Sequence, residues 1–342
     1  MNAQAPSTWA DPKPPALNIP LLDRLREAGG SFVPLAELSG DPAADVAALA
    51  AFGFNLERRE DGAIAYRGPS PRLCPDQIEH DLGTIRIGRR VAVWRRIGST
   101  NDAAARGAST PANDGLVVMA EEQTAGRGRR GRAFVAPAGS SLLTSILLFP
   151  PDDVAPGGAA WLTVLAAVAV AEVVSDRTGR PGLVKWPNDV RVDGRKICGV
   201  LVERMLRPPG GEGPTSAVVV GIGLNVNIPE AAFPPAIRDK ATSLSILAGR
   251  DFDRSELARD LLRRLDRRYD ETLRNGPAAL SAAWRDRCEH LGRPVRVLTS
   301  SDTLEGTLTD VDLESGLTLT SSDCGPTVVQ LDAVLALEPA TA

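Results

Sequence analysis

The sequence predicts an α+β protein built from three consecutive domains. At 342 residues the chain is longer than one typical domain of about 100 to 200 residues. In the middle of the chain, short apolar runs separated by hairpin-length turns predict strands, and apolar residues spaced as in helices lie between them. This order is typical of an α+β fold rather than of alternating βαβ units. After residue 290 the apolar residues recur only with the strand period of two.

The first domain is expected at residues 17–68, after a flexible leader at residues 1–16 that is rich in proline and small residues. Apolar spacing predicts three short helices in this domain, at residues 17–28, 35–38 and 41–52. Residues 55–67 then alternate around an Asp61–Gly62 turn, which predicts a β-hairpin. Three helices followed by a hairpin is the pattern of a winged helix-turn-helix.

The second domain follows a proline-rich boundary at residues 69–75 and extends over residues 76–290. Its apolar runs predict six strands, at residues 90–95, 116–120, 142–149, 183–186, 196–204 and 217–226. They also predict three helices, at residues 101–108, 161–178 and 254–274. The third domain, residues 291–342, is too short for a sandwich, so we expect a small, partly closed β-barrel of about five strands.

Composition excludes several classes of protein. Lys and Arg number 39 against 43 Asp and Glu, so no net charge directs the chain to nucleic acid or to an anionic membrane. The four cysteines are scattered and only two histidines accompany them, which argues against a zinc site or a disulfide framework and favours a reducing compartment. The longest apolar run, residues 161–174, is too short to span a bilayer, and no secretory signal is found, so we expect a cytoplasmic protein.

The most informative segment is the run Q-T-A-G-R-G-R-R-G-R at residues 123–132. It matches G-x-G-x-x-G, but residues 133–139 contain a proline and β-formers where a dinucleotide-binding turn would open a helix, so that interpretation is rejected. Glycines allow N–H groups to point at an anion, and guanidinium groups form forks for phosphate or carboxylate oxygens. The loop is suited to closing over a polyphosphate, although an isolated run of this kind is more often a solvated basic loop.

Four shorter segments place polar residues at the ends of expected elements. S-T-N at residues 99–101 precedes a helix, where capping alone would explain it. K-W-P-N-D at residues 185–189 ends a strand in a turn, and the basic pair at residues 195–196 opens the next strand. G-I-G-L-N-V-N at residues 221–227 ends an apolar strand in two asparagines. Each segment alone is a weak signal.

Taken together and in this order, the segments resemble the motifs of the biotin protein ligases: S-T-N, Q-T-A-G-R-G-R-R-G-R, K-W-P-N-D, R-K-I-C-G-V-L-V-E and G-I-G-L-N-V-N. The resemblance runs from about residue 97 to residue 227, and more loosely includes residues 241–244 and 291–295. It implies a catalytic domain of the class II aminoacyl-tRNA synthetase-like type, with a mixed, mainly antiparallel sheet and flanking helices.

The resemblance also implies a two-step, ATP-dependent reaction. The carboxylate of biotin attacks the α-phosphorus of ATP, which gives biotinyl-5′-AMP and pyrophosphate. A lysine ε-amine of the biotin carboxyl carrier protein of acetyl-CoA carboxylase then attacks the activated carbonyl and releases AMP. This chemistry needs positioning and charge neutralisation by arginines and Mg²⁺ rather than a protein nucleophile, so a histidine-poor chain suffices.

Position in the family motifs implies the roles of the site residues. Those that would contact biotin or hold its carboxylate are Ser99, Thr100, Asn101, Gln123, Arg127, Gly128, Arg129 and Lys196. Those that would face the nucleotide are Arg132, Lys185, Trp186, Asn188, Asp189 and Asn225. The candidate catalytic residues are Arg129, Lys196 and Asp189, the last of which either binds Mg²⁺ or orients the incoming lysine.

Two further expectations concern the arginine-rich loop. Residues 124–133 should be mobile without ligand and become ordered once the adenylate forms, which would keep water from the mixed anhydride. Where the family usually has a tryptophan after this loop, the chain has Phe134, which keeps an apolar wall but lacks the N–H donor.

Three other roles fit the sequence less well. Some similar ligases also repress transcription through a winged helix, so a bifunctional ligase and repressor of the biotin operon is the alternative function. DNA binding is disfavoured, because residues 17–68 contain five arginines against eight acidic residues and residues 41–52 have no cation. Lipoate ligases and octanoyl transferases share the catalytic fold but usually have a triple-glycine run with a His-Asp that this chain lacks. A non-catalytic biotin sensor would have lost the nucleotide residues. A homodimer is left open.

Overall fold

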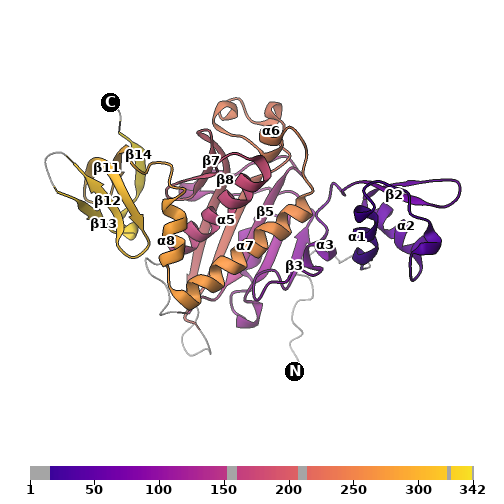
Figure 1. Cartoon of the computed structure of the whole chain (residues 1–342). Coiled ribbons are helices and arrows are strands. Elements are labelled where there is room, and N and C mark those ends of the chain that lie inside the picture. Colours follow the sequence, from indigo (N-terminus) through magenta and orange to yellow (C-terminus); the bar gives the residue numbers. More distant parts are fainter. Residues whose placement is uncertain (1–15, 152–159, 207–213, 322–324, 341–342) are drawn as a thin grey trace, which may run out of the picture.

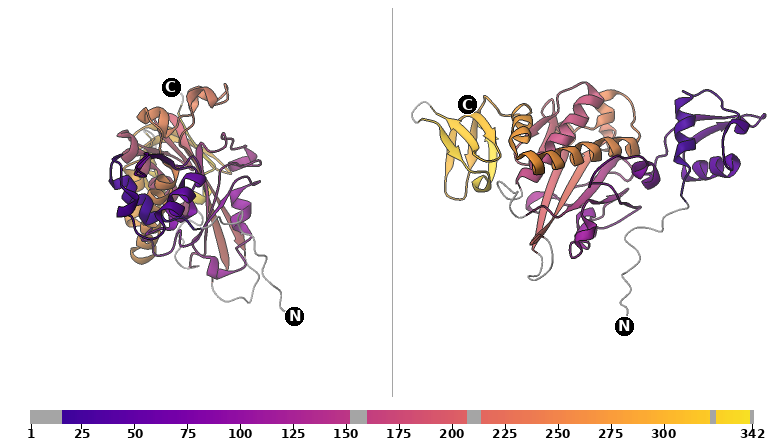
Figure 2. Two further views of the ribbon diagram at one scale, coloured as in Figure 1. Left: turned by 90° about the vertical axis from the view of Figure 1, so that its right-hand side faces the viewer. Right: turned by 60° about the horizontal axis from the view of Figure 1, so that its bottom comes forward.

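The computed structural model describes residues 16–151, 160–206, 214–321 and 325–340. An N-terminal module, a central sheet covered by helices and a small C-terminal sheet follow one another in chain order across the molecule (Figure 1). The N-terminal module and the C-terminal sheet lie at opposite ends of the central part in a second view (Figure 2). The expected leader, apart from Ala16, lies outside the described residues.

The N-terminal module contains the helices and the hairpin in the expected order. Its elements are helix α1 (Ile19–Glu27), the 3₁₀ turn η1 (Leu35–Glu37), helix α2 (Pro42–Phe52) and strands β1 (Asn55–Arg58) and β2 (Ile64–Gly68). Asn18 and Asp41 cap the two helices by accepting backbone N–H groups of Leu21 and Ala44. The second expected helix is only a 3₁₀ turn. The apolar side chains of the module form a core of their own.

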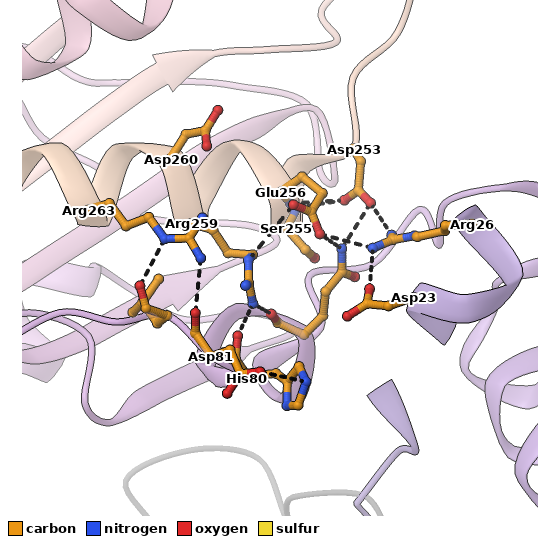
Figure 3. A network of polar contacts seen from close by, with 12 residues as sticks. Asp23, Arg26, His80, Asp81, Asp253, Ser255, Glu256, Arg259, Asp260 and Arg263 are labelled. Carbon is orange, nitrogen blue, oxygen red and sulfur yellow. Dashed lines mark hydrogen bonds and ion pairs between the residues drawn. The ribbon is translucent and has the colours of Figure 1, made fainter. Parts of the chain in front are cut away.

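Arg26 of α1 joins this module to the central part. Its guanidinium lies 2.7 Å from Asp253 and 2.9 Å from Glu256, at the start of helix α7 (Arg254–Asn275). In Figure 3 the Arg26 side chain points toward Asp253 and Glu256. Gln77, in helix α3 (Pro75–Glu79), donates to the same two carboxylates. The guanidinium also lies over the ring of Tyr66, 5.3 Å from its centroid. One side chain thus connects α1, the hairpin and α7.

The central sheet has seven strands in the order β3-β4-β5-β9-β8-β7-β6. Only β3 and β4 run parallel, so the sheet is mixed and mainly antiparallel, as the resemblance implied. In chain order the strands are Val91–Trp94, Leu116–Ala120, Ser141–Leu148, Leu183–Lys185, Asp189–Val192, Arg195–Leu206 and Ser216–Asn225. Six of them match the expected runs, and β7 (Asp189–Val192) was missed because its four residues were interpreted as part of a turn.

Helices cover both faces of this sheet. Helix α5 (Ala160–Thr178) and helix α7 pack on one face, where Trp161 stacks on Tyr269 with ring centroids 5.6 Å apart (Figure 1). Helix α4 (Thr100–Ala105) packs on β4, β5 and β9, with Ala103 and Ala104 in a separate apolar cluster. The short helices α6 (Leu244–Ala248) and α8 (Ala278–Arg285) were not expected.

Short 3₁₀ turns connect many of these elements. They are η2 (Pro111–Asn113), η3 (Arg129–Gly131), η4 (Glu230–Ala232), η5 (Arg238–Lys240) and η6 (Leu331–Ala333). Within the described residues, no helix combines the length and the apolar character that crossing a membrane would require.

The C-terminal sheet has five antiparallel strands in the order β13-β12-β11-β10-β14. They are β10 (Pro294–Leu298), β11 (Thr303–Asp312), β12 (Gly316–Thr320), β13 (Thr327–Val329) and β14 (Ala336–Pro339). The number of strands agrees with the sequence, but in the described part β13 and β14 remain separate edges and no closed barrel forms. Closure would require pairing by β13, which has only three residues. The apolar core of this sheet is continuous with the core of the central part, so the packing does not mark a boundary at residue 290. The expected domain boundaries, at residue 290 and at residues 69–75, stay predictions.

We predict that Arg26→Gln loosens the N-terminal module. The substitution removes a charge-assisted contact to two carboxylates, which is worth about 1.5–3 kcal/mol. Thermolysin should cleave the boundary at residues 69–75 at least about fivefold faster, since local opening sets the cleavage rate. Arg24→Gln on the same helix is the control, because Arg24 lies 3.9 Å from Glu37 and both side chains are more than half exposed. Equal cleavage of the two variants would show that Arg26 does not hold the N-terminal module against the central part.

Candidate active site

A cavity of about 290 Å³ lies between the arginine-rich loop, the strands β6 to β9 and the C-terminal sheet. It gathers residues from every sequence motif. The site residues expected from the sequence that border it are Ser99, Thr100, Asn101, Gln123, Arg127, Gly128, Arg129, Arg132, Lys185, Trp186, Asn188, Asp189 and Lys196. The fold therefore brings together segments that are separated by up to about a hundred residues of sequence.

Neutral hydrogen-bonding groups form one wall of the cavity. The segments around Ile97 and Gln123 run side by side as a parallel bridge. The side-chain oxygen of Gln123 accepts the backbone N–H of Thr100 at 2.7 Å and its hydroxyl at 2.9 Å. The Ser145 hydroxyl lies 2.8 Å from the Thr100 hydroxyl and donates to the side-chain oxygen Oδ1 of Asn101 at 2.6 Å. These contacts fix the side chains of Thr100 and Asn101 in a buried network.

Asn101 is held between two strands. Its amide nitrogen donates to Glu203 of β8 at 2.6 Å. A Cβ atom on Gly221 of β9 would lie well inside contact distance of the Asn101 carboxamide. Glycine at this position is therefore required by the close approach of α4 to the sheet, a reason that the sequence alone did not reveal.

The arginine-rich loop is a tight hairpin. Arg127 and Ala133 form an antiparallel bridge, and the N–H of Gly128 donates to the carbonyl of Arg132 at 2.7 Å. Arg130 adopts a left-handed conformation with φ of 56°. The ring of Phe134 then packs over β9, because a Cβ on Gly223 would lie 2.6 Å from it. Phe134 thus supplies the apolar wall that the sequence analysis expected.

Two of the four arginines of the loop have partners among the described residues, and two do not. Arg127 forms a two-point ion pair with Asp102, at 2.8 and 2.6 Å, and lies 3.3 Å from Glu203. Arg130 donates to the carbonyl of Leu335 at 3.0 Å. By contrast, the side chains of Arg129 and Arg132 make no hydrogen bond or ion pair with the described residues. Their guanidinium groups border the cavity, and Asp189, which pairs with Lys196, is a carboxylate that acts on Arg129 from beyond ion-pair distance.

Burial shapes the electrostatics of these groups. Desolvation, followed by repulsion from Arg130, lowers the pKa of Arg129, which nevertheless stays protonated because arginine titrates far above neutrality. The hydrogen bond from Arg127 lowers the pKa of Asp102, so this carboxylate stays ionised at neutral pH. Net positive charge is left on the part of the loop that faces the cavity.

The K-W-P-N-D segment connects β6 to β7 and brings a second cation to the cavity. The Lys196 ammonium lies 2.6 Å from the Asp189 carboxylate. The Asn188 amide nitrogen donates to the carbonyl of Val200 at 2.8 Å, which fixes the turn. The buried indole of Trp186 packs on Trp284, with ring centroids 5.2 Å apart, so its ring is part of the core. Lys185, at the end of β6, has no ion pair among the described residues.

The structure does not bring Asn225 to the cavity. Its buried amide donates to the carbonyl of Thr242 at 3.0 Å. Asn227 exchanges hydrogen bonds with the backbone of Phe252, at 2.9 and 3.0 Å. Both asparagines therefore connect the end of β9 to segments that follow it, and the expected nucleotide contact of Asn225 has no support in this geometry.

Sequence reasoning missed several residues of the site. Asp102 and Glu203 hold Arg127, and Glu203 was visible only as the last letter of R-K-I-C-G-V-L-V-E. Residues 335–338 of the C-terminal sheet also border the cavity, although no motif marks them. A backbone carbonyl such as that of Leu335 leaves no signal in the sequence.

Comparison with known proteins agrees with this geometry. The sequence model of the biotin/lipoate A/B protein ligase family matches residues 93–225. The bifunctional ligase/repressor BirA of Bacillus subtilis (strain 168) is 31% identical over 272 residues, which cover 79% of this chain and 82% of that protein. This chain belongs to the biotin/lipoate A/B protein ligase family. The cavity is thus the candidate active site of a family ligase.

Two further relatives support the assignment. The biotin–[acetyl-CoA-carboxylase] ligase of Mycobacterium tuberculosis is 36% identical over 258 residues, covering 72% of this chain and 91% of that ligase. The solved structure of the biotin protein ligase from Aquifex aeolicus in complex with biotin and ATP superimposes with a TM-score of 0.62 at 25% identity. The match covers 74% of this chain and 100% of that one. The central fold is therefore that of the biotin ligases.

We predict that Gly221→Ala disturbs the wall formed by Asn101. The added methyl group overpacks the contact between α4 and β9, which costs about 1–3 kcal/mol. Urea unfolding should show this loss, and the contact between Asn101 and Glu203 should open in a crystal structure of the variant. Gly98→Ala is the matched control, because a Cβ there meets nothing within 4 Å. Equal stability of the two variants would show that Asn101 can move aside freely.

Proposed function

We propose that the chain is an ATP-dependent biotin ligase. It forms biotinyl-5′-AMP from biotin and ATP and transfers biotin to a lysine of the biotin carboxyl carrier protein of acetyl-CoA carboxylase. The observation that carries this proposal is the division of one cavity between a wall of neutral hydrogen-bonding groups and a set of cations that form no ion pair in the described part of the chain. The names of the Mycobacterium tuberculosis ligase and of the Aquifex aeolicus complex agree with these substrates.

The neutral wall fits biotin. A cyclic urea offers two N–H donors and one acceptor, which Ser99, Thr100 and Gln123 can satisfy with hydroxyl and carboxamide groups. Phe134 lies beside this wall and covers β9, where it provides apolar contact for the ring system. Lys196 and Arg129 complete this side of the site by holding the carboxylate that attacks ATP.

The cations fit the nucleotide. Arg132, Lys185 and Arg129 can neutralise the phosphates as pyrophosphate leaves, which is how phosphoryl and nucleotidyl transfer is accelerated without a protein nucleophile. In the second step the lysine amine of the carrier attacks the adenylate carbonyl, its proton is lost and AMP leaves. Asp189 borders the cavity beside Lys196 and is placed to orient that amine.

A magnesium ion would accompany the nucleotide rather than occupy a protein cage. Within the described ranges no group of three or more His, Cys, Asp or Glu residues could hold a metal ion. Asp189 is the carboxylate of the K-W-P-N-D turn and borders the cavity, which fits the usual binding of Mg²⁺ by one or two carboxylates together with substrate phosphates. The ion would add positive charge at the phosphates.

The arginine-rich loop would act as a cover for the adenylate. We propose that residues 124–133 are more mobile without ligand and become ordered when the adenylate phosphate meets Arg129 and Arg132. Exclusion of water protects a mixed anhydride from hydrolysis.

The N-terminal module, which we interpret as winged-helix-like, would have no role in DNA binding. The Bacillus subtilis relative is named a ligase and repressor, which makes a bifunctional protein the second candidate. The exposed face of α2, however, consists of alanines, and Arg26 of α1 is already paired with Asp253 and Glu256. Phosphate anchoring and base readout both need cations or amides that this face lacks.

The ligase activity is tested with the full chain, biotin, labelled ATP, MgCl₂ and a biotin carboxyl carrier domain. We expect AMP and pyrophosphate to form and the carrier to gain one biotinyl group. Arg129→Ala and Lys196→Ala should each slow adenylate formation by at least about a hundredfold, the range seen when a charge-stabilising donor is removed. Arg89→Ala is the control, since Arg89 is exposed and does not border the cavity. Undiminished activity of the first two variants, or equal use of lipoate, would overturn the proposal.

Absence of DNA binding is tested by mobility shift at low salt with biotinyl-5′-AMP present. A promoter fragment from the host's biotin-synthesis genes should migrate like a random duplex, because phosphate neutralisation dominates affinity and helix α2 has no cation. Selective retention of the promoter fragment would establish the bifunctional role instead.

A further inference from the structure

We propose that Asp102 and Glu203 are positioning residues for adenylate formation. They hold the base of the arginine-rich loop through Arg127, and thereby leave Arg129 and Arg132 to bind the ligand. This inference rests on the proposed biotin ligase function and assigns a role within the same site.

The first support is geometric. Asp102 lies on α4 and Glu203 on β8, and both carboxylates contact the guanidinium of Arg127. Asp102 receives two parallel hydrogen bonds, at 2.8 and 2.6 Å, which is the arrangement that best restrains an arginine. The base of the loop is therefore connected to a helix and to the sheet at once.

The second support is that Glu203 is shared. The same carboxylate accepts the Asn101 amide at 2.6 Å and lies 3.3 Å from Arg127. Asn101 in turn belongs to the neutral wall through Ser145. Glu203 thus sets the position of the loop relative to the wall where biotin is expected to bind.

The third support is electrostatic. Four arginines occupy positions 127 to 132, and two lysines, Lys185 and Lys196, face the same cavity. Like charges at this spacing repel one another, most strongly where water is scarce. Two carboxylates at Arg127 offset that repulsion at the base of the loop. Among the described residues no carboxylate forms an ion pair with Arg129 or Arg132, and only Asp189 acts on Arg129 from a distance, so positive charge is kept where the phosphates are expected to bind.

The rival explanation is that the Arg127 side chain binds biotin directly, as the family motif implied. In the structure its terminal nitrogens already meet both carboxylates. Direct binding would require these contacts to break. The two explanations differ in what happens when the carboxylates, rather than the arginine, are changed.

The experiment compares Asp102→Asn, Glu203→Gln, their combination, Arg127→Met and the triple variant. Biotin KM, kcat for adenylate formation, and the rate at which biotinyl-5′-AMP leaves the enzyme are measured. The contacting side chains are partly exposed, at 52% for Asp102 and 38% for Arg127, so each single substitution should have a modest effect. Asp176→Asn is the control, because Asp176 also pairs with an arginine, at 2.6 Å, but on the helices behind the sheet.

If the carboxylates act through Arg127, the Asp102→Asn/Glu203→Gln variant should raise biotin KM and adenylate release about fivefold to tenfold. Transfer of biotin from added biotinyl-5′-AMP at saturation should stay within about twofold of wild type, because Arg129 and Lys196 are intact. Adding Arg127→Met should then have no further effect, as expected for residues that act as one unit. A large effect of Arg127→Met with little effect of the carboxylate changes would overturn the proposal in favour of direct binding.

Proteolysis separates this proposal from the proposed function. In ligand-free protein, trypsin should cleave after the arginines of residues 124–133 several-fold faster in the Asp102→Asn/Glu203→Gln variant than in wild type or Asp176→Asn. This readout needs no ligase activity, and unchanged cleavage would refute the positioning role. If wild type makes no biotinyl-5′-AMP, the proposed function fails whatever the cleavage result. Asp102→Asn alone, at a half-exposed position, provides a variant that should fold normally.

Discussion

The crowding of positive charge around one cavity is the constraint on which the rest of the site depends. Lys196 is paired with Asp189, and Arg127 with Asp102 and Glu203, but Arg129, Arg132 and Lys185 form no ion pair with the described residues. Such an arrangement is costly without a ligand and favourable with a polyanion. The sheet, the glycines of β9 and the C-terminal segment all serve to keep these groups within reach of one another.

The cavity depends on parts of the chain far apart in sequence. Arg130 reaches the carbonyl of Leu335, 205 positions later, so the C-terminal sheet forms one side of the site. On the other side, Glu121, two residues before Gln123, accepts the backbone N–H of Leu73 at 2.6 Å and the buried Arg254 at 2.6 Å. The boundary segment after the N-terminal module is thereby attached to the strand end that leads into the loop. The boundary segment is thus attached just before the loop, through Glu121, and the C-terminal sheet at its tip, through Arg130.

The sequence predicted helices and strands best where the apolar pattern is long, and site residues best where they belong to one short motif. Helix α7 shows a full apolar stripe and was expected almost to the residue, whereas β7, with four residues, resembles a turn. Every site residue implied by the motifs except Asn225 borders the cavity, but residues 335–338, which also border it, were not predicted. Motif order could not show orientation: Asn225 turns to the carbonyl of Thr242, 17 positions later. Nor could it separate the arginines by role, because the partners of Arg127 lie 25 and 76 positions away.

The glycines of the arginine-rich loop illustrate why orientation matters for mechanism. The sequence suggests that they provide freedom, yet a Cβ on Gly126 would lie 2.6 Å from the carbonyl of Phe134, so this glycine allows close packing at the base. Freedom is confined to the tip, where Arg130 and Gly131 have φ of 56° and 69°. Because the base is packed and the tip carries cations, the closure proposed for residues 124–133 would need movement only at the tip, and the wall formed by Thr100, Asn101 and Gln123 would stay in place.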